Sequence, residues 1–82
     1  MPPEVTLYSR KGCHLCDVVK DSLARLAGSG ASFTWREVDI DSDPDLQRLY
    51  NEEVPVVLIN GRKAFKYHME VRDFLRALAT RE

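Results

Sequence analysis

The stretch Cys13-His14-Leu15-Cys16 contains the only two cysteines of this 82-residue chain. It stands where an apolar, strand-like run ending at Ser9 gives way to a helical pattern, and this junction is the strongest indication of the fold. Two thiols at C-x-x-C spacing have two main uses. They exchange electrons by closing and opening a small disulfide, or they supply half of a zinc site.

The elements on either side of the cysteines follow from the pattern of apolar residues. A strand over residues 4–9 precedes the pair. A helix follows from Cys13 and stops at Gly28-Ser29-Gly30, because glycine accepts the left-handed conformation at a helix C-terminus. The buried face of this helix is expected to carry Leu15, Val18, Val19, Ser22, Leu23 and Leu26.

The second half of the chain predicts two more helices and three more strands. A strand over residues 33–40 leads to the helix-start signal Asp41-Ser42-Asp43-Pro44-Asp45, and a short helix follows. The apolar, β-branched run 54–59 predicts a strand inside the sheet, and Asn60-Gly61 predicts a hairpin turn. The charged residues of 62–66 suit a strand at the sheet edge. The apolar sides of the last two helices are expected to carry Leu46, Leu49 and Tyr50, then Val71, Phe74, Leu75 and Leu78.

The resulting order is βαβαββα, which places the chain in the α/β class. A strand–helix–strand unit favours parallel strands, and the hairpin adds antiparallel ones. We therefore expect a mixed four-stranded sheet with helices on both faces, a three-layer α/β/α sandwich. A single domain spanning residues 1–82 is expected from the length.

Charge and composition restrict the environment of the protein. With 12 basic and 13 acidic residues, the net charge of −1 gives no general attraction to nucleic acid or to an acidic membrane. The start of the chain, Met1-Pro2-Pro3-Glu4-Val5, predicts neither a signal peptide nor a transmembrane segment. We expect a cytoplasmic protein, and a monomer. In the reducing cytoplasm a transient catalytic disulfide is more compatible than a permanent structural one.

Zinc is the weaker of the two uses for the cysteines. Cys13, His14, Cys16 and His68 nominally make four ligands. A structural zinc site normally takes a second ligand pair at regular spacing, and this sequence has none. We therefore predict no metal ligands and no bound cofactor.

Electron exchange requires a thiolate near neutral pH. A free cysteine has a pKa of about 8.5, and C-x-x-C sites at helix N-termini lower it. We predict Cys13 as the attacking nucleophile, stabilised by the helix dipole and by the nearby cations Arg10, Lys11 and His14. Cys16, one turn on, would then resolve the mixed disulfide. A solvated surface pair remains the alternative interpretation of Arg10 and Lys11.

The chain resembles the thioredoxin superfamily in its smallest, glutaredoxin-like form. The resemblance is carried by the stretch Tyr8 to Cys16, by Val54-Pro55 and by Asn60-Gly61, and it is closest to a small bacterial glutaredoxin-like subgroup. It implies that Pro55 follows a cis peptide bond. The backbone of Val54 would then face the cysteines and pair with an extended substrate segment, as in strand addition. A proline at an ordinary strand start is the alternative.

The resemblance implies a thiol–disulfide oxidoreductase that reduces protein or glutathione mixed disulfides. Its partner would be a disulfide-containing protein or a small-molecule thiol, with recycling by glutathione as co-substrate or by a reductase. Residues 65–70 lack the Gly-Gly turn of glutaredoxins, so the partner class stays open. An iron–sulfur cluster would require glutathione as co-ligand. The alternative function is a binding or adaptor module, or a redox sensor, that docks partners around Val54-Pro55 without turnover.

Overall fold

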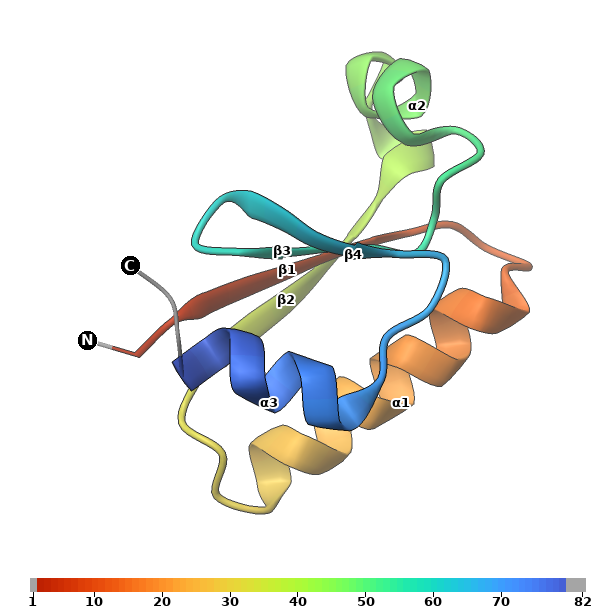
Figure 1. The fold of residues 1–82 in the computed structure, drawn as a ribbon. Helices are drawn as coiled ribbons and strands as arrows, with labels where there is room; N and C mark the ends of the chain where they lie inside the picture. The colour runs from red at the N-terminus through yellow and green to blue at the C-terminus, as the bar shows by residue number, and fades with distance from the viewer. Residues whose placement is uncertain (1, 80–82) are drawn as a thin grey trace.

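The computed structural model describes residues 2–79 and contains the predicted elements in the predicted order (Figure 1). The strands are β1 (Glu4–Ser9), β2 (Thr34–Asp39), β3 (Val56–Ile59) and β4 (Arg62–Lys66). The helices are α1 (His14–Gly28), α2 (Pro44–Tyr50) and α3 (Val71–Ala79), and a 3-10 turn, η1 (Ile40–Ser42), precedes α2. No helix in this part of the chain has the length and apolar character needed to cross a membrane.

The four strands form one mixed sheet in the order β2-β1-β3-β4. β1 pairs with β2 in parallel and with β3 antiparallel, while β4 closes the hairpin antiparallel to β3. The interior position of β3 and the edge position of β4 confirm the predictions made from their apolar and charged compositions. Tyr8 lies opposite Val56, so the end of β1 and the start of β3 meet at the same end of the sheet.

The hairpin turn confirms the Asn60-Gly61 prediction. Asn60 and Gly61 have φ angles of 52° and 83°. Both lie in the left-handed region that a two-residue hairpin turn needs and that asparagine and glycine accept most readily. Asn60 also joins the turn to the start of β1. Its N–H donates to the Glu4 carbonyl at 2.7 Å, and its Oδ1 accepts from the Glu4 N–H at 2.9 Å.

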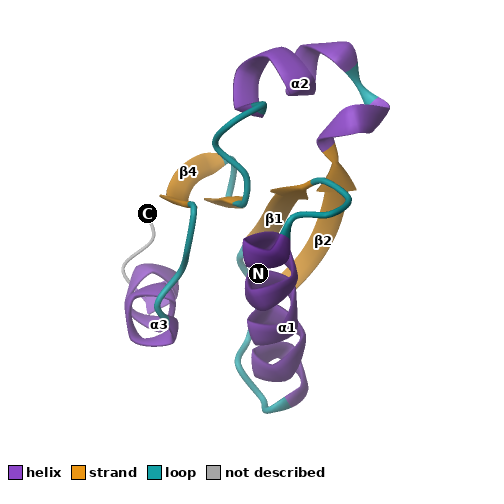
Figure 2. Ribbon diagram, turned by 90° about the vertical axis from the view of Figure 1, so that its right-hand side faces the viewer, coloured by secondary structure: helices purple, strands orange, loops and turns teal. Residues whose placement is uncertain are grey.

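The core lies between one face of the sheet and the helices α1 and α3, which Figures 1 and 2 show on the same side. Its buried members come from two strands, β1 and β3, from the two helices and from the approach to β2. They are Val5, Leu7, Val19, Leu23, Phe33, Val57, Ile59, Phe74 and Leu78.

The predicted buried face of α1 is wrong in part. Cys16 is buried together with Val19 and Leu23, whereas Leu15 and Val18 are about half exposed. Two overlapping stripes at helical spacing occur in this helix. Only the position of the sheet selects the one that contains Cys16.

The apolar sides predicted for the last two helices are also only partly buried. In α3, Phe74 and Leu78 enter the core, while Val71 and Leu75 stay exposed. α2 lies on the opposite side of the sheet from α1 and α3, as predicted (Figure 2), but it contains no buried residue, and Leu49 is exposed. The second helical layer is therefore thin.

Two strand boundaries differ from the prediction. β3 begins at Val56 instead of Val54, because Pro55 has no N–H to donate to the ladder. β2 covers residues 34–39 instead of 33–40. Phe33 packs into the core before the strand starts, and Ile40 turns into η1, whose first turn is capped by the Asp39 carboxylate.

Candidate redox site

Cys13 and Cys16 are joined by a disulfide at the N-terminus of α1. Their Cα atoms are 5.2 Å apart, within the usual range for a disulfide. Cys13 is the N-cap of the helix, and its Sγ accepts the Cys16 N–H at 3.1 Å. The two sulfur-bearing residues differ in access: Cys13 is half-buried, whereas Cys16 is only 2% exposed.

The local sequence explains why the helix begins here. Gly12 has a φ of +80°, a conformation that few other residues accept, and it turns the chain from β1 into α1. The Cys13 N–H donates to the Arg10 carbonyl at 3.4 Å, and the Asp17 N–H donates to the Cys13 carbonyl at 3.2 Å. The Asp17 carboxylate in the first turn also favours the positive end of the helix dipole.

Val54-Pro55 is a cis peptide bond, as the resemblance implied. Pro55 is buried and Val54 half-buried. The Pro55 carbonyl accepts the Tyr67 N–H at 2.8 Å, which brings the β4–α3 loop alongside. Because Tyr8 pairs with Val56, the Val54-Pro55 segment lies at the end of the sheet from which the redox loop, residues 10–13, departs.

Sequence reasoning missed Tyr67 at this end of the sheet. It has a φ of +73°, within the stretch that lacks the Gly-Gly turn of glutaredoxins, and it is exposed, with the Lys66 Nζ 5.4 Å from its ring centroid. No signal in the sequence distinguishes it from its neighbours.

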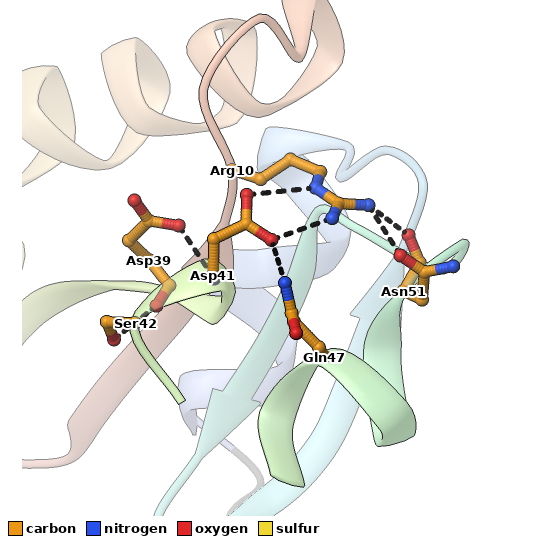
Figure 3. A network of polar contacts seen from close by, with 6 residues as sticks. All are labelled: Arg10, Asp39, Asp41, Ser42, Gln47 and Asn51. Carbon is orange, nitrogen blue, oxygen red and sulfur yellow. Dashed lines mark hydrogen bonds and ion pairs between the residues drawn. The ribbon is translucent and has the colours of Figure 1, made fainter. Parts of the chain in front are cut away.

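Arg10 is bound by residues of the two segments that flank α2, Asp41 before the helix and Asn51 after it (Figure 3). Its Nη2 donates to Asp41 Oδ1 at 2.7 Å, and its Nη1 donates to both the carbonyl and the Oδ1 of Asn51, at 2.9 and 2.7 Å. The hydrogen bond to Asp41 raises the pKa of Arg10 and lowers the pKa of Asp41. The other predicted cations, Lys11 and His14, are exposed beside Cys13.

A second polar cluster lies beside the redox loop and was not predicted. Ser9 is 4% exposed, and its hydroxyl donates to Glu37 Oε2 at 2.7 Å. Lys20 Nζ lies 3.0 Å from Glu37 Oε1. Burial acts to raise the pKa of Glu37, but the hydrogen bonds from Ser9 and Lys20 outweigh it and leave the pKa below its ordinary value. The available signal was Ser9 itself, a hydroxyl at the third inward position of β1 after Val5 and Leu7.

The lowered pKa of Glu37 predicts an acid-sensitive contribution to stability. Ionised Glu37 stabilises the folded chain above its unfolded-state pKa of about 4.3, and this contribution is lost as the pH falls through the lower folded-state pKa. We expect the urea midpoint of wild type to fall more steeply than that of Glu37→Gln between about pH 5 and pH 3. Parallel midpoint–pH profiles for the two proteins would contradict this assignment.

The nominal zinc ligands do not assemble into a site. Within residues 2–79, no three His, Cys, Asp or Glu side chains gather closely enough to hold a metal ion. What the site brings together is a disulfide pair of unequal exposure, a cis-proline segment and two polar clusters.

Residues 4–79 match the model of a protein family described as the glutaredoxin-like domain (DUF836). The uncharacterized protein Rv0508 of Mycobacterium tuberculosis is 35% identical over 66 residues, which make up 74% of this chain and 67% of that protein. The solution structure of protein Ne2328 from Nitrosomonas europaea is similar with a TM-score of 0.79 and 30% identity, over 95% of this chain and 93% of that one.

Mitochondrial thioredoxin 3 of Saccharomyces cerevisiae in its oxidized form is similar with a TM-score of 0.70, over 94% of this chain and 76% of that one. At 14% identity this likeness concerns the fold alone. The predicted thioredoxin-like fold is thereby confirmed.

Proposed function

This chain belongs to the glutaredoxin-like domain family (DUF836), and we propose from that premise that it is a thiol–disulfide oxidoreductase. Cys13 is the attacking thiolate and Cys16 the resolving thiol. The observation that carries this assignment is the unequal exposure of the pair: a substrate sulfur can approach the half-buried Cys13, whereas Cys16 is only 2% exposed.

The thiol–disulfide exchange proceeds in two steps. The Cys13 thiolate attacks one sulfur of the substrate disulfide; a mixed disulfide forms, and the first substrate thiolate leaves and takes up a proton. Cys16 then gives up its proton and attacks the Cys13 sulfur. This forms the intramolecular disulfide and releases the second substrate thiolate, which is protonated in turn. The substrate gains two electrons and two protons, and glutathione or a reductase dithiol returns them to the pair.

The Val54-Pro55 segment supports an extended substrate. Among the hydrogen bonds of residues 2–79 that lie outside helices and strands, none involves the Val54 backbone. Its N–H and C=O groups therefore suit pairing with a substrate strand. Exposed Lys11 and His14 border Cys13 and would contact the same substrate. Protein disulfides and glutathione mixed disulfides are both candidate substrates, and the catalytic assignment is tested independently of them.

We expect the reduced protein to alkylate at Cys13 rapidly near pH 7, because a helix N-terminus stabilises the thiolate. Tandem mass spectrometry after brief iodoacetamide treatment would locate the label at Cys13 and leave Cys16 largely unmodified. After mild oxidation the intact mass should fall by two hydrogens and recover with dithiothreitol. If both thiols react slowly, with a pKa near about 8.5, the pair is not catalytic and a docking function is favoured.

A further inference from the structure

We propose that Arg10 is a positioning residue whose guanidinium holds residues 51–54 against the redox loop, and that this contact sets the affinity for extended protein disulfides. The inference rests on the proposed function and concerns the same site. It replaces the role predicted from the sequence, in which Arg10 stabilises the Cys13 thiolate. Residues 51–54, which lead into Pro55, form the approach segment.

The contacts of Arg10 join three parts of the chain (Figure 3). The residue stands at the start of the redox loop, and its carbonyl accepts the Cys13 N–H. Its guanidinium binds the Asp41 carboxylate in η1 and reaches both the carbonyl and the side chain of Asn51, where the approach segment begins. Gln47 of α2 donates to the same Asp41 oxygen at 2.8 Å, so the helix is included in the network.

The approach segment follows α2, and α2 has no buried residue that would fix it on the sheet. The position of the segment therefore depends on polar contacts. Besides Arg10, the segment and the end of α2 are held by the stacking of Tyr50 on Tyr8, with ring centroids 4.8 Å apart, and by the 2.9 Å ion pair between Lys63 and Glu53. Loss of Arg10 removes the contacts that join this segment to the redox loop.

The same geometry affects the binding of an extended substrate without affecting the reactivity of the Cys13 sulfur. The charge of Arg10 is paired with Asp41, and that pairing raises the pKa of Arg10. An extended substrate would pair with the backbone at Val54, three residues after Asn51. A small disulfide needs only access to the Cys13 sulfur. Displacing the approach segment should therefore weaken the binding of protein substrates and leave small ones unaffected.

Two variants distinguish positioning from stabilisation of the thiolate. Arg10→Met removes the guanidinium, and Asp41→Asn retains it but breaks the ion pair. If Arg10 positions the segment, both variants raise KM for a protein disulfide such as insulin about tenfold, with kcat within about twofold. Turnover of hydroxyethyl disulfide and the pH profile of Cys13 alkylation stay unchanged. The matched control is Arg48→Met, which removes an exposed guanidinium on α2 that is paired with Asp45. It should leave KM and kcat for insulin, the turnover of hydroxyethyl disulfide and the alkylation profile unchanged.

Stabilisation of the thiolate gives a different set of results. Arg10→Met would then raise the pKa of Cys13 and slow both substrates. Asp41→Asn, by freeing the guanidinium, would lower that pKa. Shifts of opposite sign in the two variants would overturn the positioning role.

Hydrogen exchange tests the contact without any turnover. In the oxidised protein, the amides of residues 51–54 should exchange faster in Arg10→Met and Asp41→Asn than in wild type and Arg48→Met. If wild type reduces neither substrate, the proposed function fails, while this exchange result still decides the role of Arg10. Unchanged exchange at residues 51–54 in both variants would overturn it.

Discussion

Cys13→Ser is expected to lower the disulfide reductase activity by about a thousandfold or more. A serine hydroxyl is not ionised near neutral pH and cannot form the mixed disulfide. The loss should be the same for insulin and for hydroxyethyl disulfide, since both react at the Cys13 sulfur. The measurement is kcat/KM for each substrate with dithiothreitol as reductant, corrected for the reaction of dithiothreitol alone.

Cys16→Ser provides the complementary test. Its Cys13 is intact and can attack, but the mixed disulfide has no internal thiol to resolve it. We expect a covalent adduct with a protein substrate that accumulates, withstands denaturing gels without reductant and disappears with dithiothreitol. Full turnover of protein disulfides by Cys16→Ser would contradict the resolving role. If the reduced forms of both serine variants have the same urea midpoint as reduced wild type, neither result reflects unfolding.

The second large effect concerns Phe74, which is fully buried in α3 and packs edge-to-face on Phe33 with ring centroids 5.3 Å apart. Phe74→Ala is expected to lower the free energy of unfolding by about 3–5 kcal/mol, through lost burial and the cavity left behind. A domain of this size has roughly 4–12 kcal/mol in total, so a large share of the stability would go. Urea denaturation followed by circular dichroism would measure the loss.

Leu75 is the matched control for Phe74. It is the next residue in the same helix, but its side chain is 40% exposed. Leu75→Ala changes helix propensity little and removes few core contacts, so we expect a change within about 1 kcal/mol. Equal losses in the two variants would contradict the placement of α3, in which only Phe74 is buried. They would agree instead with the sequence prediction, in which both residues are buried.

Local patterns were enough for the order and most boundaries of the elements. β1 and β4 have the predicted bounds, and the Asn60-Gly61 turn lies where its dipeptide placed it. The C-x-x-C pair at the start of α1 also followed from the sequence, since a strand-like run changes there into a helical period. Each of these features depends on residues close together in the chain.

Long-range contacts decided the remaining features. The face of α1 that is buried depends on where the sheet lies, which periodicity alone did not distinguish. Ser9 and Glu37 meet across 28 positions of sequence. Arg10 meets Asp41 and Asn51 across 31 and 41 positions. The sequence neighbourhood of Arg10 suggested that it stabilises the Cys13 thiolate. Its hydrogen bonds to Asp41 in η1 and to Asn51 at the C-cap of α2 have no signal in the local sequence.

The sequence by itself determined that two thiols stand at a helix N-terminus in a βαβαββα chain, because capping, turns and periodicity are local properties. The tertiary structure alone decided that the buried face of α1 is the one that contains Cys16, and that Arg10 is paired with Asp41 and Asn51. The physical reason is that burial and charge pairing depend on distance in space. For these residues that distance is set by segments far away in the chain.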